Sequence, residues 1–409
     1  MSEKEQKNYL GDGGNIKVLP VNLKEKIIES TERIKERLIE MGWRPWLKPE
    51  IEPKGAVFGE GMAEGSSIVG IEKYLGMVDP KERIAYFPSV KLTNDSTVAR
   101  TYVKFNPDFK EDIIFIGGKE AEGREKERVI NVLERFRQVT GITSKALVVS
   151  ENFFRRGVYG KGLGTSAAAG GALATALISA GVPELIKNTG FVESIARIMA
   201  GSAPQSVAGG FSVWLSDSSF VSRPHESYSV RIDDGKIPLK LVIVPIEQSA
   251  KTEEAHEAAV KSPYYLDWCR KKITAVPDLI EAVIEKDLKR IGEHAEDDSI
   301  WLNKIITTGG GVNNWETDTE KLRQKIIELR KNGLTAYYSM DTGPSVAVLT
   351  TPKNFKAVKK ELENALGGKY KGKVFLADLT GGPRILPLEE KKNLIRQIEE
   401  ELENFGIEI

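Results

Sequence analysis

The sequence predicts a two-lobe α+β fold with a ligand cleft between the lobes, and three observations lead to this prediction. The chain has 409 residues, which is long enough to bury a large core and to form two lobes. A glycine-rich loop in the first half, residues 159–171, lies between an apolar segment of strand length and an Ala- and Leu-rich helix. In the second half, a strand-like segment ends at an acidic turn that contains Asp341.

Composition argues against several classes of protein. Lys plus Arg and Asp plus Glu number 59 each, and this balance argues against a general nucleic-acid binder. The single cysteine, Cys269, excludes an intrachain disulfide framework and suits a reducing compartment. The sequence has no apolar run of membrane-spanning length, and its charged N-terminus lacks the core of a signal peptide. We therefore expect a cytoplasmic protein with neither a nucleic-acid nor a membrane partner.

Residues 1–54 are expected to form an N-terminal extension. Residues 1–20 are polar and glycine-rich, and 22–42 has the pattern of an amphipathic helix. Its apolar residues recur at helical spacing: Leu23, Ile27, Ile34, Leu38 and Met41. We expect this helix to pack on the body of the protein or on a partner subunit, which leaves a homodimer possible. Three prolines between 45 and 53 then indicate an extended connector.

The first lobe is expected to span 55–235 and the second 236–409. In the first lobe the expected strands are 55–59, 84–92, 97–105, 112–116, 145–150 and 211–215, and the expected helices are 125–140, 172–180 and 191–201. In the second lobe the expected strands are 239–245, 334–339, 346–350 and 373–379, and the expected helices are 252–260, 263–293, 321–332 and a charged terminal helix at 389–405.

The glycine-rich loop has the features of a phosphate-binding site. Glycines allow backbone N–H groups to approach a ligand closely. A helix that opens at Thr165 or Ser166 directs its free N–H groups and its positive dipole end to the same place. We expect the following residues to contact phosphate: Arg155, Arg156, Lys161, Gly162, Gly164, Thr165 and Ser166. The alternative is a packing turn of small residues; a Walker loop is excluded because no Gly-Lys-Ser/Thr ends the motif.

Several polar residues outside the loop have two interpretations each. Ser202 and Ser206, in a segment rich in small residues, either bind a ligand or cap the flanking elements. Lys73, taken alone, is an ordinary solvated charge, and Asp341 is a turn residue unless it faces the glycine loop. The run Glu296-Asp297-Asp298 suggests a metal site, but we expect a solvated helix face there. The three histidines are scattered and do not suggest a zinc site.

Four segments, in order over about residues 55–385, resemble mevalonate diphosphate decarboxylase, a member of the GHMP superfamily. Residues 73–76, Lys-Tyr-Leu-Gly, resemble that family's Lys-Tyr-Trp-Gly-Lys, with Met77 at the second Lys. Residues 150–169 resemble its Ser-x-Asn-Asn-Phe-Pro and Ala-Gly-Leu-Ala-Ser-Ser-Ala, without the Pro. Residues 201–210 resemble its Gly-Ser-Gly-Ser-Ala-Cys-Arg-Ser and Gly-Gly segment, and 341–345 resemble its Phe-Asp-Ala-Gly-Pro-Asn.

The resemblance implies a GHMP-kinase-like fold and a catalytic pair, Asp341 and Lys73. It also implies substrate contacts from Tyr74, Ser202, Gln205 and Ser206, where Gln205 stands at the position of the family's carboxylate-binding Arg. The small-molecule partner it implies is a phosphorylated mevalonate.

The missing loop Pro, the lost Arg and second Lys and the N-terminal extension make the chain most similar to the archaeal bisphosphomevalonate decarboxylase branch. That similarity implies conversion of (R)-mevalonate 3,5-bisphosphate to isopentenyl phosphate, CO2 and phosphate, with no cofactor and no metal. One alternative is an ATP- and Mg²⁺-dependent mevalonate 5-diphosphate decarboxylase that gives isopentenyl diphosphate. A second is a GHMP small-molecule kinase, and a third is a non-catalytic binding protein of the same fold.

Overall fold

The computed structural model describes residues 19–154, 162–246, 252–313, 315, 317–367 and 372–405. Its helices are α2 (Val21–Glu40), α3 (Gly123–Thr140), α4 (Thr165–Gly181), α5 (Thr189–Met199), α6 (Ala203–Ala208), α7 (Thr252–Lys261), α8 (Tyr265–Ile284), α9 (Leu288–Thr308), α10 (Thr317–Lys331), α11 (Phe355–Leu366), α12 (Lys392–Ile395) and α13 (Glu399–Asn404). Short 3-10 helices are η2 (Pro183–Leu185), η3 (Ser218–Val221), η4 (Pro224–Glu226) and η6 (Leu388–Lys391). None of the helices within the described ranges is long and apolar enough to cross a membrane.

The strands belong to a large sheet, a smaller sheet and a short hairpin. They are β1 (Gly59–Glu72), β2 (Met77–Asp79), β3 (Ile84–Ala85), β4 (Ser89–Asn106), β5 (Ile113–Ile116), β6 (Lys119–Glu120), β7 (Lys145–Phe154), β8 (Phe211–Trp214), β9 (Ser229–Arg231), β10 (Lys240–Val244), β11 (Ala336–Ser339), β12 (Val346–Thr350), β13 (Phe375–Ala377) and β14 (Arg384–Ile385). The chain thus combines helices with β-sheets, as predicted. The helix predicted at 22–42 is present as α2.

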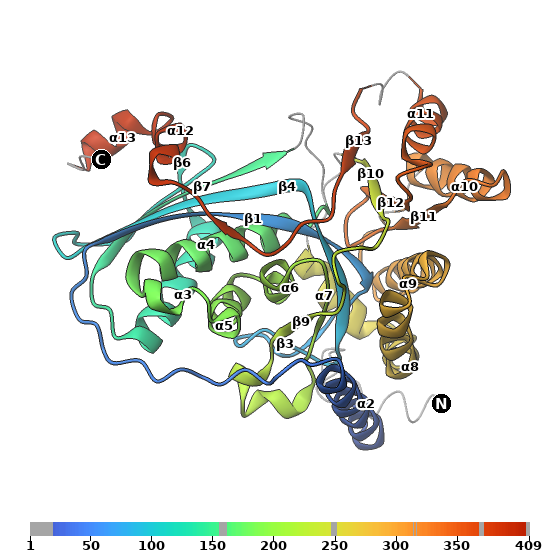
Figure 1. The fold of residues 1–409 in the computed structure, drawn as a ribbon, viewed down its shortest axis with the longest axis horizontal. Helices are drawn as coiled ribbons and strands as arrows, with labels where there is room; N and C mark the ends of the chain where they lie inside the picture. Colours follow the sequence, from blue (N-terminus) through green and yellow to red (C-terminus); the bar gives the residue numbers. More distant parts are fainter. Residues whose placement is uncertain are drawn as a thin grey trace.

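The large sheet has the strand order β14-β1-β4-β7-β5-β6, and β8 and β9 extend it from β4 (Figure 1). The strand predicted at 84–92 is divided, because 84–85 form β3 and only 89–92 belong to β4. The strand predicted at 97–105 continues the same β4, which pairs antiparallel with β1 over almost its whole length. The register of this pair shifts between Ser66 and Ser67. At its start, residues 89–92, β4 pairs with β8 on the edge opposite β1, so β1, β4 and β8 run side by side there.

Helix α4 packs against β1 on the face of the large sheet that also carries α3, α5 and α6 (Figure 1). The contact is between backbones, because a Cβ atom on Gly61 would lie 2.4 Å from the carbonyl oxygen of Ala176. A Cβ on Gly65 would lie 2.3 Å from that of Ala168. Glycine at these positions therefore fixes the depth of α4 on the sheet and, with it, the place where the N-terminus of α4 lies.

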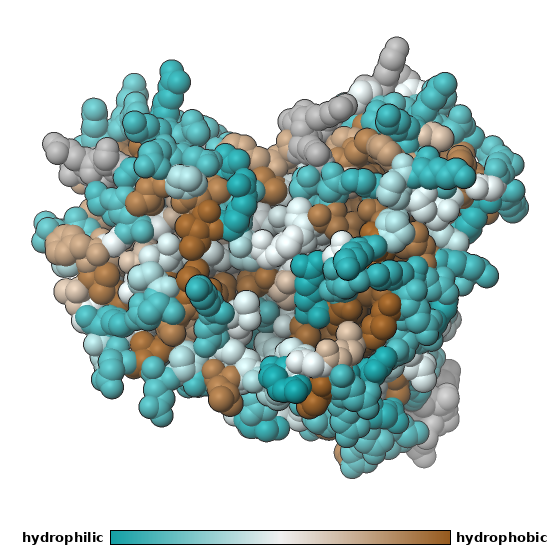
Figure 2. Space-filling view, viewed as in Figure 1, coloured by the Kyte–Doolittle hydropathy of each residue, from teal (hydrophilic) through white to brown (hydrophobic). Residues whose placement is uncertain are grey.

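The smaller sheet has the order β11-β12-β10-β13, with antiparallel pairs throughout. Side chains alternate along β10, as the period of a strand requires. Val242 and Val244 pack with α10 and α11, and Leu241 and Ile243 belong to the core that contains α8 and α9. The space-filling view of the same side shows hydrophilic side chains over most of the rim and apolar ones toward the centre (Figure 2).

The chain crosses between the two sheets twice, once from β9 to β10 and once from β13 to β14. The crossings lie together, because Lys240 at the start of β10 forms an ion pair with Asp378 just after β13. Asp378 also bonds to the large sheet through Asp95, whose carboxylate accepts the Asp378 N–H at 2.7 Å. Strand β14 then pairs with β1, and α12 and α13 cover the outer face of the large sheet. The division at residues 235 and 236 remains a proposal.

The prediction of a strand at 55–59 is wrong. Gly55 forms only an isolated bridge with Ile142, and the strand starts at Gly59. Gly55 has a φ of 67°, a left-handed conformation that cannot continue an extended strand.

The helix predicted at 263–293 is two helices, α8 and α9. A turn between them places Lys286 at a φ of 59°. The carboxylate of Asp287 then accepts the N–H groups of Lys289 and Arg290, at 3.0 and 3.1 Å, and starts α9 as its N-cap.

The terminal helix predicted at 389–405 is also interrupted. It is divided into η6, α12 and α13, since the buried Ile398 leaves the helical conformation with a φ of −132°. The interruption separates two short helices that still share one apolar cluster with the outer face of the sheet.

Helix α2 packs on the body of the protein, which is one of the two arrangements that its pattern allowed. Arg37 forms a two-pronged ion pair with Glu281 of α8, with bonds of 2.7 and 3.0 Å. The hydroxyl of Ser30 donates to the carbonyl of Ile273 at 2.8 Å. Four of the five predicted apolar contacts are buried, but Met41 is 40% exposed because it lies just past the end of α2.

We expect Ile34→Ala to lower the free energy of unfolding by about 2–5 kcal/mol, since it leaves a cavity under a side chain that is 2% exposed. Urea denaturation followed by circular dichroism measures the change. Ile39→Ala, on the same helix at 44% exposure, is the matched control and should change stability by less than about 1 kcal/mol. Equal effects of the two substitutions would show that α2 does not depend on this packing.

Candidate active site

Asp341 follows β11 at the edge of the smaller sheet, and it reaches β1 of the large sheet. The Gly70 N–H donates to Asp341 Oδ2 at 3.4 Å, and the Ser339 hydroxyl donates to the Gly70 carbonyl at 2.5 Å. A Cβ atom on Gly70 would lie 2.6 Å from both Asp341 Oδ1 and Lys73 Cγ. The absence of a side chain at Gly70 therefore lets the two residues predicted as a catalytic pair lie together.

The glycine loop meets the same turn from the other side. A Cβ on Gly162 would lie 2.7 Å from Gly343 Cα, so the loop and the Asp341 turn touch through their glycines. Gly164 has a φ of 70° and precedes α4, which begins at Thr165 as predicted. Ser166 is exposed in the first turn of that helix, where backbone N–H groups lack a partner within the helix. The predicted cations Arg155, Arg156 and Lys161 lie outside the described residues.

Lys73 is buried, with 3% of its surface exposed, and its ammonium is held from α9. It donates to the Ser299 hydroxyl at 3.2 Å and lies 3.7 Å from Asp298 Oδ2. Ser299 also accepts the Met340 N–H at 3.0 Å, so one hydroxyl links Lys73 to the residue before Asp341. Burial lowers the pKa of Lys73 below its ordinary value, and Asp298 and Asp341 oppose that shift.

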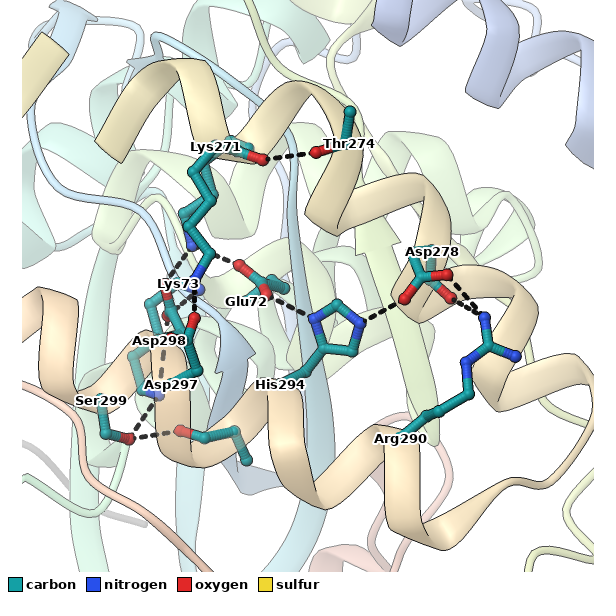
Figure 3. Close-up of polar contacts among 12 residues, drawn as sticks. Glu72, Lys73, Lys271, Thr274, Asp278, Arg290, His294, Asp297, Asp298 and Ser299 are labelled. Atoms are coloured by element: carbon teal, nitrogen blue, oxygen red, sulfur yellow. Dashed lines mark hydrogen bonds and ion pairs between the residues drawn. The ribbon is translucent and has the colours of Figure 1, made fainter. Parts of the chain in front are cut away.

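An ionic network extends from buried Lys73 toward the surface (Figure 3). Asp298 accepts the Lys73 N–H at 2.8 Å and forms an ion pair with Lys272. Lys272 also pairs with Glu72 at 2.5 Å, and His294 bonds to Glu72 and to Asp278, both at 2.8 Å. The end of β1 is thus joined by charge to both α8 and α9.

The solvated face predicted for Glu296, Asp297 and Asp298 is wrong for Asp298, which is 1% exposed. Consecutive residues point in different directions around a helix. Asp297 therefore pairs with Lys271 at the surface, and Glu296 pairs with Arg330. Burial by itself raises the pKa of Asp298, but the ammonium groups of Lys272 and Lys73 outweigh burial and hold it below its ordinary value.

Gln205 and Ser206 are placed differently from what the resemblance implied. Both are fully buried. The Gln205 amide donates to the carbonyls of Ser89 and Ser212, at 3.1 Å each. The Ser206 hydroxyl donates to the Ser66 carbonyl at 2.7 Å. These side chains support the strands from inside, since their hydrogen-bonding groups are directed at main chain.

Two further predicted contacts lie close to the site. Tyr74 is 7% exposed, and its ring packs edge-on against Trp214 with centroids 4.9 Å apart. Its hydroxyl lies beside Gly201, where a Cβ would come within 2.4 Å of it. Ser202, the next residue, is partly exposed at the start of α6.

Lys91 is a residue of the site that the sequence prediction missed. It lies on β4, is 8% exposed, and its ammonium is 5.0 Å from the centroid of the Tyr74 ring. Burial lowers the pKa of Lys91 to about 8, and the charge of Asp341 opposes the shift. A signal was present, because Lys91 stands between two apolar residues, Val90 and Leu92, in a predicted strand. Lys272 and Glu72 carried no comparable signal.

Comparisons with known proteins place the chain among its relatives. Residues 66–229 match the diphosphomevalonate decarboxylase-like N-terminal domain family. A phosphomevalonate decarboxylase of Haloferax volcanii is 30% identical over 300 residues, covering 73% of this chain and 90% of its own length. A mevalonate 3,5-bisphosphate decarboxylase of Thermoplasma volcanium is 30% identical over 289 residues, covering 70% and 75%. The crystal structure of mevalonate diphosphate decarboxylase from Staphylococcus aureus superposes with a TM-score of 0.73 at 24% identity, covering 81% of this chain and 98% of that one.

The fold, with a glycine loop before α4 and an acidic turn facing it, is that of a GHMP-superfamily enzyme. Within that superfamily, the chain belongs to the family of mevalonate-phosphate decarboxylases, which are carboxy-lyases of the mevalonate pathway.

We expect Gly70→Ala to lower kcat for CO2 release by about 100-fold, because the new Cβ displaces Asp341, Lys73 or both, and misplacement of about 1 Å has an effect of this size. Gly381→Ala is the control, since a Cβ there meets no atom within 4 Å, and its rate should stay within about twofold of wild type. A wild-type rate for Gly70→Ala would mean that the contact of Gly70 with Asp341 has no part in catalysis.

We expect Asp298→Asn to lower the free energy of unfolding at neutral pH by about 3–5 kcal/mol, because it leaves Lys272 and Lys73 short of a buried negative charge. Asp297→Asn, one residue away at the surface, should change it by less than about 1 kcal/mol. The folded-state pKa of Asp298 is depressed, so its contribution is present above the unfolded value of about 4 and is lost as the pH falls. Denaturation curves at neutral and acid pH should therefore show the largest gap between the variants at neutral pH.

Proposed function

We propose that this protein converts (R)-mevalonate 3,5-bisphosphate to isopentenyl phosphate, CO2 and phosphate without ATP. The observation that carries the proposal is the meeting of Asp341, Lys73 and the glycine loop at one place, where two sheets touch. Mevalonate 3,5-bisphosphate decarboxylases are among the relatives, at 28% and 30% identity.

The proposed reaction removes two groups from one substrate, the phosphate on C3 and the C1 carboxylate. The C3–O bond to phosphate breaks, and its electron pair leaves with the phosphate. Positive charge develops at C3, and the electron pair of the C1–C2 bond forms the C2–C3 double bond as CO2 departs. The negative charge of Asp341 stabilises the developing cation, and Lys73 supplies the opposite charge that orients this carboxylate.

The departing phosphate is assigned to the loop before α4. Gly162 and Gly164 have no side chain to hold a ligand away from the backbone, and the first turn of the helix adds the positive end of its dipole. Phosphate gains charge as the C3–O bond breaks, so these groups stabilise the transition state more than the bound substrate. Ser166 and Ser202 remain proposed contacts, together with Arg155, Arg156 and Lys161.

A second candidate is a phosphomevalonate decarboxylase that uses ATP to phosphorylate the 3-hydroxyl first. The match to the Haloferax protein of that name favours it, since it covers 90% of the relative. The glycine loop fits a nucleotide phosphate as well as a substrate phosphate. Within the described residues no group of three or more His, Cys, Asp or Glu side chains stands ready to hold a metal ion.

The test measures CO2 release from three substrates, each with EDTA alone and with ATP and Mg²⁺. The substrates are mevalonate 3,5-bisphosphate, mevalonate 5-phosphate and mevalonate 5-diphosphate. We expect release from the bisphosphate in EDTA, because a substrate already phosphorylated at C3 needs no phosphoryl transfer. Asp341→Asn keeps the shape of the side chain without its charge, and it should abolish that release in a folded protein.

A strict requirement for ATP and Mg²⁺ would contradict the proposal. Activity on mevalonate 5-phosphate would then favour the second candidate, and activity on mevalonate 5-diphosphate would assign the protein to the diphosphomevalonate decarboxylases. Formation of ADP without CO2 would indicate a kinase. If Asp341→Asn retained activity within a few-fold of wild type, Asp341 would be only a turn residue.

A further inference from the structure

Lys91 lies on the reacting face of the large sheet. In the register of the sheet it is opposite Gly70 of β1 on one edge and Ser212 of β8 on the other. Side chains of directly opposite residues project from the same face. A Cβ atom on Gly70 would lie 2.6 Å from Asp341 Oδ1, so Asp341 is on the face to which a Gly70 side chain would point. Lys91 therefore projects from the same face that Asp341 approaches.

The ammonium of Lys91 is buried without a counter-ion. Among the described residues it has neither a hydrogen-bond acceptor nor a carboxylate within ion-pair distance, and the group it contacts is the Tyr74 ring. The other two buried lysines of this region differ. Lys272 has two carboxylates, and Lys73 has Ser299 and Asp298. A buried charge without a partner is costly, and proteins normally pair it.

The charged and titratable groups around Lys91 do not neutralise it. Asp341 and Asp298 attract the ammonium, and Lys73 repels it, each from beyond ion-pair distance. His256 adds no negative charge; burial lowers its pKa to about 4, and its Nδ1 accepts the Gly76 N–H at 2.9 Å. The position is therefore prepared for an anion that comes from outside the protein.

The anion that fits this position is a carboxylate. The phosphate leaving from C3 is assigned to the loop at Gly162, whereas Lys91 lies on β4, between β1 and β8. Gln205 stands where the resembling family has a carboxylate-binding Arg, but its amide is bound to the main chain of Ser89 and Ser212. Ser212 is the residue opposite Lys91, so Lys91 places a cation next to the strand position that Gln205 binds.

We propose that Lys91 binds the C1 carboxylate of the phosphorylated mevalonate. The assignment rests on the proposed substrate class, and it makes Lys91 a binding residue that selects substrates carrying a carboxylate. The ammonium orients the C1–C2 bond against Asp341, so that the bond that breaks lies next to the developing cation. Tyr74 limits the movement of the ammonium from its other side.

The test measures binding, with two phosphorylated probes that do not react in the absence of nucleotide. Mevalonate 5-phosphate has the carboxylate, and isopentenyl phosphate lacks it. Isothermal titration calorimetry gives the Kd of each probe for wild type, Lys91→Met, Lys91→Arg and Lys104→Met. Lys104 is the control, because it is a partly exposed lysine of the same strand.

We expect Lys91→Met to weaken mevalonate 5-phosphate by about 10- to 100-fold, the usual range for loss of a charged hydrogen bond. Isopentenyl phosphate should change by less than about twofold, and Lys91→Arg should recover most of the lost affinity because it restores a cation. The Tm of the ligand-free Lys91→Met protein should equal or exceed that of wild type, since an unpaired buried charge is removed.

Three results would overturn the assignment. Equal weakening of both probes would mean that Lys91 binds a phosphate. Unchanged affinity for both would mean that it contacts no ligand. A lower Tm together with weaker binding of both probes would mean that the lysine supports the fold. The proposed function can fail separately from this inference. If the wild-type protein released no CO2 from the bisphosphate but still bound mevalonate 5-phosphate through Lys91, the function would be wrong and the assignment of Lys91 would stand.

Discussion

The pairing of β1 with β4 is the constraint on which the active site depends. Gly70 and Lys91 stand opposite each other in that pair. The same register sets the position of Glu72, which ends β1, and of Lys73, which follows it. A shift of one residue would exchange the faces of every side chain on the strand. The irregularities of the pair at Ser66 and again near Gly70 are therefore part of how the site is positioned.

The pairing of β1 with β4 buries charged side chains, and the free-energy cost of that burial has to be offset. Bringing Glu72 and Lys73 to the junction with α8 and α9 removes both from water, and Lys272 and Asp298 compensate them. These ion pairs also fix positions, because Glu72 is held by Lys272 of α8 and Lys73 by Asp298 of α9. Lys73 is thereby fixed relative to Asp341 without a direct bond between them, through Ser299 and the backbone of Met340. Such fixed geometry is what electrostatic catalysis requires.

The local features of the site were predictable, and the long-range ones were not. The start of α4 at Thr165 and the turn at Asp341 are marked by glycines and by the neighbouring apolar segments, which are signals within about ten residues. The pairing of Glu72 with Lys272 joins residues 200 positions apart and leaves no trace in a single sequence. The burial of Asp298 was misjudged because three adjacent acids were treated as one group, although a helix separates them. Sequence similarity showed that Gln205 lacks the expected charge, but it could not show that its amide faces the main chain.

The double crossing between the sheets holds them together beside the site. The two crossing segments are joined to each other by Lys240 and Asp378 and to the large sheet by Asp95. The turn that bears Asp341 belongs to the smaller sheet, and Gly70 belongs to the large one. The bond between the Gly70 N–H and Asp341 therefore exists only while the two sheets are in contact, so the reacting centre is a property of the sheet contact and of neither sheet alone.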